Sequence, residues 1–176
     1  MRKLEMDELN RVDIEGFKQQ EKNGIAIVLD NVRSMHNVGS AFRTADAFNV
    51  EKVVLCGITA RPPHREIHKT ALGATESVSW EYEEGTNLAL QRLKKEGYEV
   101  VGVEQVTETV KLNDFAPKTD KKYAFVFGNE AFGMSEEALG DCDFFVEIPQ
   151  FGTKHSLNVS VTVGVVLWDY ISKTNA

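Results

Sequence analysis

Two patterns of hydrophobic and polar positions alternate along this chain. Short apolar runs, typical of buried strands, predict strands at 24–30, 53–56, 77–82, 98–103, 123–127 and 144–148. Apolar positions three or four residues apart predict helices at 38–48, 88–95 and 136–139. Asn37 is the predicted N-cap of the first helix and Ser135 that of the last. Strands that alternate with helices predict an α/β fold, a mainly parallel sheet flanked by helices.

One segment near the C-terminal end has the pattern of a strand. Apolar and polar residues alternate from Leu157 to Val165, and most of the apolar residues are β-branched valines. Judged by its period alone, this segment is a strand.

Length and composition indicate one globular domain over 1–176, with 1–22 as an N-terminal arm or short helix. Of the 176 residues, 42% are hydrophobic and 27% charged, which is ordinary for a globular protein that needs neither disulfides nor a structural metal. Cys56 and Cys142 are expected to be free thiols in a cytoplasmic protein. The charged N-terminal residues do not resemble a signal peptide, and no apolar stretch is long enough to span a membrane.

The net charge of −7 argues against nucleic acid as a partner unless cations gather locally. They do so in the segment 61–69, where Arg61, Arg65 and Lys69 stand against a single carboxylate. Composition leaves two interpretations open, a solvated loop or a contact with nucleic acid. His64 and His68 in this segment are not expected to bind a metal, because no further ligand lies nearby in the sequence.

Three polar segments that contain glycine follow predicted strands, at 37–45, 128–135 and 148–160. Ligands of open α/β sheets bind beyond the carboxyl ends of the strands, where such loops lie. Glycines let a backbone approach a ligand closely, and a helix that begins at Asn37 offers free N–H groups to an anion. Arg43, about one and a half turns further on, is expected to face the same ligand.

Each polar residue in these segments also has a plain structural interpretation. Arg43 could be a surface cation, Glu130 an acid in a glycine-rich turn, Ser156 a helix cap and Asn158 a surface residue.

Taken together, the three segments resemble the motifs of the SpoU-type (TrmH-like) RNA 2′-O-ribose methyltransferases of the SPOUT superfamily. The residues that match the first motif are Asn37, Gly39, Arg43, Thr44 and Ala45, and those that match the second are Gly128, Asn129, Glu130 and Gly133. The third and most specific motif is matched by Ile148, Pro149, Gly152, Ser156, Leu157, Asn158, Val159 and Ser160. The resemblance covers roughly residues 24–172, with a family-like segment at 71–74. Ala131 departs from it, since many members have a second glycine there.

The resemblance implies a SPOUT fold, in which the C-terminal region, about 123–172, is threaded as a trefoil knot. Hydrophobic patterns cannot reveal a knot, because knots are rare exceptions to the rules of chain connection. The resemblance also implies that Leu157 to Ile171 is a helix, against its alternating pattern, and that this helix packs against its counterpart in a homodimer.

The implied activity is S-adenosylmethionine-dependent 2′-O-methylation of a ribose in structured RNA, with tRNA favoured over rRNA for a chain this compact. Gly128, Ile148 and Leu157 would line the cofactor pocket. The implied catalytic residues are Arg43, Asn37, Glu130, Ser156 and Asn158. Arginine stays protonated, so Arg43 is better suited to stabilise a developing alkoxide than to accept its proton.

RNA would be held by the basic segment, through Arg61, Arg65 and Lys69, together with the N-terminal arm and Lys121, Lys122 and Lys154. A non-catalytic RNA-binding protein that kept the fold is the alternative, and the combined presence of the implied catalytic residues argues against it. An ordinary nucleotide-dependent enzyme on a Rossmann-like sheet is disfavoured, because no Gly-x-Gly-x-x-Gly fingerprint follows the first strand. Neither a metal nor a membrane is an expected partner.

Overall fold

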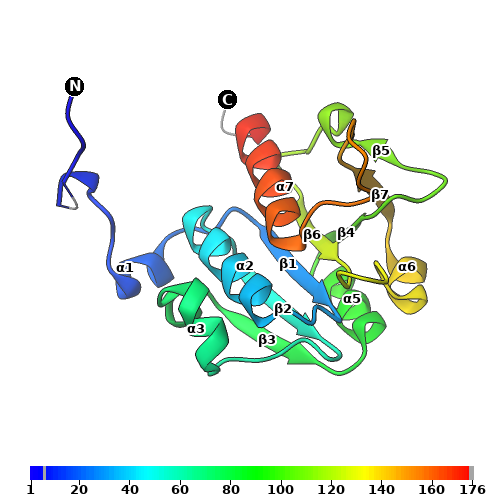
Figure 1. Ribbon diagram of the computed structural model, residues 1–176, viewed down its shortest axis with the longest axis horizontal. Coiled ribbons are helices and arrows are strands. Elements are labelled where there is room, and N and C mark those ends of the chain that lie inside the picture. Colours follow the sequence, from blue (N-terminus) through cyan, green and yellow to red (C-terminus); the bar gives the residue numbers. More distant parts are fainter. Residues whose placement is uncertain (6, 175–176) are drawn as a thin grey trace.

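The computed structural model describes residues 1–5 and 7–174, which form a parallel β-sheet between two layers of helices (Figure 1). The strands are β1 (Ile25–Asp30), β2 (Lys52–Cys56), β3 (Trp80–Glu83), β4 (Tyr98–Val103), β5 (Val110–Lys111), β6 (Lys122–Phe127) and β7 (Phe144–Glu147). They lie in the order β3-β2-β1-β6-β4-β7-β5, and the neighbouring pairs that the structure describes are all parallel. The predicted α/β class and parallel sheet are therefore confirmed.

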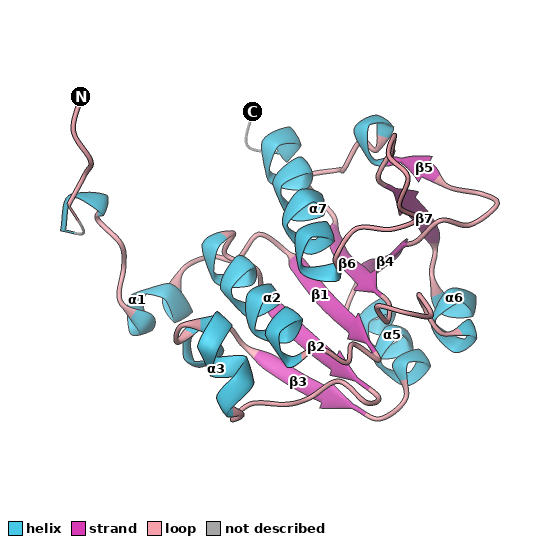
Figure 2. Ribbon diagram, in the orientation of Figure 1, coloured by secondary structure: helices cyan, strands magenta, loops and turns pink. Residues whose placement is uncertain are grey.

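The helices cover both faces of the sheet (Figure 2). One layer contains α2 (Met35–Ala47), α3 (Arg65–Ala71), α4 (Ala74–Ser77) and α7 (Val159–Thr174), and the other contains α5 (Thr86–Lys95) and α6 (Glu136–Asp141). The short α1 (Ile14–Gln19) contacts α4, and two 3₁₀ turns, η1 (Asp7–Leu9) and η2 (Leu112–Asp114), complete the elements. All six residues of β1 are buried, since helices cover both sides of this central strand.

The predicted strands and helices are found, with three corrections. Helix α2 begins earlier than predicted, so Asn37 lies in its first turn and the N-cap is Ser34, whose Oγ accepts a hydrogen bond from the Asn37 N–H (3.3 Å). The segment 61–69 is not a loop throughout, because α3 begins at Arg65. Strand β3 begins at Trp80, since Ser77 still belongs to α4. The cap at Ser135 is confirmed, as its Oγ accepts from the Ala138 N–H.

The C-terminal segment is helix α7, so the strand that its alternation suggested is wrong and the helix that the family resemblance implied is confirmed. The alternation arises because α7 is apolar on two sides. Its buried side carries Val159, Val163, Val166, Leu167 and Tyr170 at helical spacing, while Val161, Val165 and Trp168 are exposed. No helix in the described part of the chain is long and apolar enough to cross a membrane. The trefoil knot and the single-domain boundaries stay predictions.

Candidate active site

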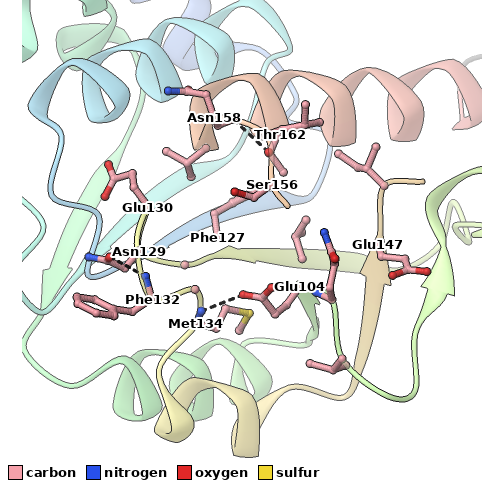
Figure 3. Close-up of a pocket in the computed structure, with 18 of the residues that line it drawn as sticks. Glu104, Phe127, Asn129, Glu130, Phe132, Met134, Glu147, Ser156, Asn158 and Thr162 are labelled. Atoms are coloured by element: carbon pink, nitrogen blue, oxygen red, sulfur yellow. Dashed lines mark hydrogen bonds between the residues drawn. The ribbon is translucent and has the colours of Figure 1, made fainter. Parts of the chain in front are cut away.

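A cavity of about 650 Å³ lies where β4, β6 and β7 end, at the carboxyl edge of the sheet (Figure 3). Its floor comes from the last residues of these strands and the residues that follow them, Val103, Glu104, Phe127, Gly128, Val146 and Glu147. The loop after β6 and the segment before α7 supply the remaining walls. This volume falls in the range of sites that bind small molecules and cofactors.

Six residues predicted for the site line this one cavity: Gly128, Glu130, Ile148, Ser156, Leu157 and Asn158. They come from the second and third sequence motifs, which the sheet brings together because β6 and β7 both lie beside β4. Their individual roles stay predictions.

Hydrogen bonds join all three motifs at one rim of the cavity. The Glu130 carboxylate accepts from the backbone N–H groups of Arg33 and Ser34, both at 3.0 Å, and from Asn37 Nδ2 at 2.9 Å. Asn158 Nδ2 in turn donates to Asn37 Oδ1 at 3.2 Å. Asn37 is thus held between the second and third motifs, although it does not line the cavity itself.

Glu130 occupies the start of α2, where the sequence predicted a free anion site. Burial alone would raise the pKa of Glu130, but the hydrogen bonds from Arg33, Asn37 and Ser34 outweigh it, so the pKa lies below the ordinary carboxyl value. An ionised carboxylate with these bonds made is poorly suited to accept a substrate proton. Glu130 is better understood as a positioning residue that fixes the loop after β6 to α2.

Replacement of Glu130 by Gln is expected to lower the free energy of unfolding by about 1 kcal/mol at neutral pH, because a charge-assisted set of bonds becomes neutral. The folded-state pKa is depressed, so this contribution is present above the unfolded-state pKa and is lost as the pH falls through the folded one. Urea unfolding of both proteins across the acid range measures it. A difference between them that grew towards acid pH would contradict this role.

The loop after β6 is held in one shape by its own polar groups. Asn129 and Gly133 exchange two backbone hydrogen bonds of 2.9 Å, and Asn129 Oδ1 accepts from the N–H groups of Ala131 and Phe132. Gly133 has φ +70°, and a Cβ added there would lie 2.5 Å from Glu104 Oε2. Glycine is therefore required at 133 by both the backbone angle and the neighbouring carboxylate.

Two carboxylates of this region were not predicted as site residues. Glu104 follows β4 and accepts from the Met134 N–H at 3.0 Å and the Gln105 N–H at 2.9 Å. Asp30, fully buried at the end of β1, accepts from Thr86 Oγ1 and the Ser135 N–H and so anchors the starts of α5 and α6. The signal available in the sequence for both was an acidic residue at the carboxyl end of a buried strand, Asp30 as the last residue of β1 and Glu104 directly after β4.

Arg43 is separated from Asn37 and from the cavity rim, although the sequence led us to expect that both residues face the same ligand. It is exposed on α2, is absent from the cavity lining, and its side chain has no hydrogen-bond or ion-pair partner within residues 1–5 and 7–174. Six positions along a helix turn the side chain by about 240° and move it by about 9 Å, which separates it from Asn37. Its catalytic role stays a prediction.

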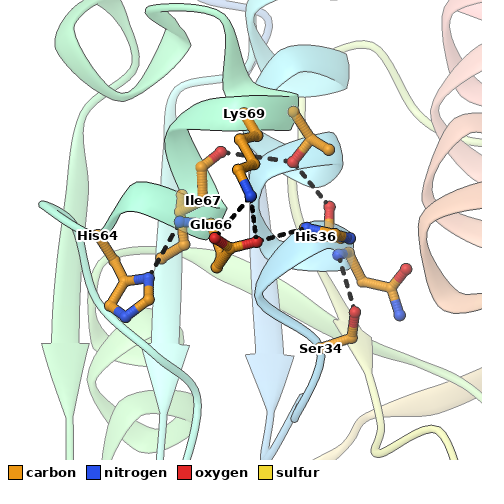
Figure 4. A network of polar contacts seen from close by, with 8 residues as sticks. Ser34, His36, His64, Glu66, Ile67 and Lys69 are labelled. Atoms are coloured by element: carbon orange, nitrogen blue, oxygen red, sulfur yellow. Dashed lines mark hydrogen bonds and ion pairs between the residues drawn. The ribbon is translucent and has the colours of Figure 1, made fainter.

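Other side chains of the protein contact two of the three cations in the basic segment 61–69. Glu66 accepts from Lys69 Nζ at 2.7 Å and contacts His36 Nε2 at 3.0 Å, which ties α3 to α2 (Figure 4). The Arg61 guanidinium lies 4.2 Å from the centre of the Tyr82 ring. Of the three cations predicted in this segment to contact RNA, only Arg65 makes no such side-chain contact within the described residues.

His64 in this segment has a structural role. His64 caps α3, because its Nδ1 accepts from the Glu66 N–H. No group of three or more histidine, cysteine or acidic side chains that could hold a metal is found in the part of the chain that the structure describes.

A parallel sheet with a cavity at the carboxyl ends of its strands, walled by glycine-containing loops, defines an α/β protein of the class that binds small-molecule ligands at this edge of the sheet. Residues 24–168 match the model of the SpoU rRNA Methylase family. The chain belongs to this family, as its three motifs indicated.

Three relatives illustrate the match. The chain is 37% identical over 145 residues to the 23S rRNA (guanosine-2′-O-)-methyltransferase RlmB of Neisseria meningitidis, covering 81% of this chain and 56% of that one. It is 34% identical over 160 residues to a Staphylococcus aureus protein named for the TrmH family of tRNA/rRNA methyltransferases, covering 89% and 62%. A solved AdoMet-bound rRNA methyltransferase from Sinorhizobium meliloti has the same fold, with TM-score 0.79, 24% identity, and 89% and 59% covered. The chain thus spans less than two thirds of each relative.

Proposed function

We propose that this chain transfers a methyl group from S-adenosylmethionine to a ribose 2′-hydroxyl of RNA. The observation that carries the proposal is that residues of the second and third family motifs line one and the same cavity. The names of the relatives support it, since one is a guanosine-2′-O-methyltransferase and another holds the cofactor. Because these relatives are longer, the activity of the whole protein is part of the proposal.

The cavity fits the proposed cofactor. Gly128 would offer its backbone to the adenosine, while Ile148 and Leu157 would supply apolar walls. When bound, S-adenosylmethionine supplies a methyl group whose bond to sulfur breaks, with the electron pair left on sulfur, as the bond to the 2′-oxygen forms. The chain has to orient the hydroxyl, stabilise the charge that develops on its oxygen and let its proton leave.

Exposed apolar residues on α7 support a homodimer. Val161, Val165 and Trp168 are exposed by 50%, 37% and 61% and lie along one side of the helix. Trp168 lies beside α2, with its ring 6.2 Å from that of Phe48. We propose that this side of α7 pairs with a second copy, and that Arg43, which is exposed on α2, serves the cavity of the other subunit.

Trp168→Glu is expected to convert the dimer to a monomer, because it places a charge in the centre of the proposed apolar contact. Light scattering after size exclusion measures the mass. Leu88→Glu is the matched control, since Leu88 is 54% exposed on α5 in the opposite helix layer. A Trp168→Glu protein that stayed dimeric, or an equal effect of Leu88→Glu, would contradict pairing through α7.

The proposal covers both tRNA and rRNA as substrates. The sequence favoured tRNA, while the relatives are named for rRNA and for either class. Arg65 and the other exposed cations near α3 would contact phosphates in both cases, and such contacts weaken as salt rises.

The proposal is tested by calorimetric titration with S-adenosylmethionine, followed by incubation of tRNA and rRNA pools with the methyl-labelled cofactor. Cofactor binding and label in one pool would support the proposal and identify the RNA class. RNA binding without any cofactor binding would favour the alternative, a non-catalytic RNA-binding protein.

A further inference from the structure

The charged side chains that line the cavity all have the same sign. They are the carboxylates of Glu104, Glu130 and Glu147, and no lysine, arginine or histidine is among the lining residues described. A phosphate or another anion would meet repulsion here, whereas a cationic ligand would be attracted.

The three carboxylates differ in how they are held. Glu130 is turned to the start of α2 by its three hydrogen bonds. The carboxylate of Glu147 points away from Glu104 (Figure 3). Glu104 is partly buried, and each of its oxygens accepts one backbone N–H, Oε1 that of Gln105 and Oε2 that of Met134.

Glu104 is therefore a fixed negative charge at the cavity. Each oxygen of a carboxylate has more than one acceptor site, so the bonds to Gln105 and Met134 leave acceptor capacity unused. A charge whose position is already fixed does not have to be ordered when a ligand binds.

We propose that Glu104 makes the cavity discriminate by charge, binding S-adenosylmethionine more tightly than S-adenosylhomocysteine. This inference rests on the proposed function. The two ligands share the adenosine and amino-acid parts, but the methylated sulfur of the first is a cation and the thioether of the second is neutral. Loss of that positive charge on transfer weakens the attraction to Glu104, so the spent cofactor leaves more readily.

The charge acts on the cofactor before transfer, so it affects binding rather than the chemical step. Glu104→Gln is expected to raise the KM for S-adenosylmethionine and leave kcat unchanged or higher. The Gln carbonyl can still accept from the Met134 N–H, so the loop after β6 keeps its support.

Calorimetry of both ligands and of sinefungin, which carries an ammonium in place of the methylated sulfur, provides the test. Glu104→Gln should weaken the binding of S-adenosylmethionine and of sinefungin about three- to tenfold, and should leave the affinity for S-adenosylhomocysteine unchanged. In the unaltered protein, the preference for the two cations should shrink as salt is raised. Glu147→Gln is the control, because it also removes one negative charge from the cavity. It should change the ratio of the affinities for S-adenosylmethionine and S-adenosylhomocysteine less than Glu104→Gln does.

The outcomes separate this inference from the function. If Glu104→Gln weakened the binding of all three ligands equally, Glu104 would only support the loop, and the inference would be overturned. It would also be overturned if the preference of the unaltered protein for the two cationic ligands did not change with salt. In both cases cofactor binding would remain. Failure of the unaltered protein to bind any of the three ligands would overturn the proposed function and the inference with it.

Discussion

Arg43→Ala is expected to slow methyl transfer by about 10²–10³-fold, the usual effect of removing one group that stabilises a developing oxyanion. Cofactor affinity should not change, because Arg43 does not line the cavity of its own subunit and its proposed contact is with the RNA rather than with the cofactor. Since arginine stays protonated, its contribution is a fixed positive charge for the 2′-oxygen or an adjacent phosphate. Single-turnover transfer at saturating RNA measures the chemical step, and calorimetry measures cofactor affinity.

The control variant is Arg65→Ala, another exposed arginine, which should weaken RNA binding without lowering the rate at saturation. Transfer that survived Arg43→Ala unchanged, or a loss of cofactor affinity in that variant, would show that the assigned role is wrong.

Mixed dimers test where Arg43 acts. The mixed dimer contains one subunit with Arg43→Ala and one subunit with a blocked cavity. If Arg43 serves the other subunit's cavity, this dimer should transfer methyl groups, because the intact Arg43 of one subunit then faces the intact cavity of the other. If Arg43 serves its own cavity, the mixture should stay inactive, since no subunit then has both parts.

Gly128→Ala is expected to abolish detectable cofactor binding and to lower the free energy of unfolding by about 1–3 kcal/mol. A Cβ at this position would lie 2.3 Å from the carbonyl carbon of Gly133 and 2.3 Å from the Met134 nitrogen. Relief requires a shift of the loop after β6, which the bonds of Asn129 and Glu104 oppose. Calorimetry and urea unfolding measure the two effects.

Gly140→Ala is the matched control. Gly140 lies in α6, has no atom within 4 Å of an added Cβ, and the change should be neutral or stabilising because alanine is the better helix former. A Gly128→Ala protein that bound the cofactor normally would contradict the close packing of the two loop glycines.

Strands and most helices could be predicted because their signals are local. The buried runs of β1 and β6 are continuous, and α5 shows the helical period directly. Helix α7 could not be predicted from its pattern, since the exposed valines on one side mask the period of the buried side. Only the resemblance to the family indicated a helix.

The site was predictable as a set of residues but not as a geometry. Sequence motifs identified Gly128, Ile148 and Leu157, which do meet at the cavity. The contact of Glu130 with Asn37 joins positions 93 residues apart, and no local pattern encodes such a contact. That contact explains why the start of α2 is not a free anion site, and the helical rotation explains why Arg43 lies elsewhere.

The central claim is that the methyl group is placed on a ribose 2′-oxygen, and alkaline hydrolysis of the labelled RNA tests it most directly. Alkali cleaves RNA through the free 2′-hydroxyl, so a 2′-O-methylated nucleotide leaves an uncut dinucleotide. We predict that label transferred by the unaltered protein is recovered in alkali-resistant dinucleotides and is lost with Arg43→Ala. Label recovered in mononucleotides would show methylation of a base and would contradict the proposed reaction.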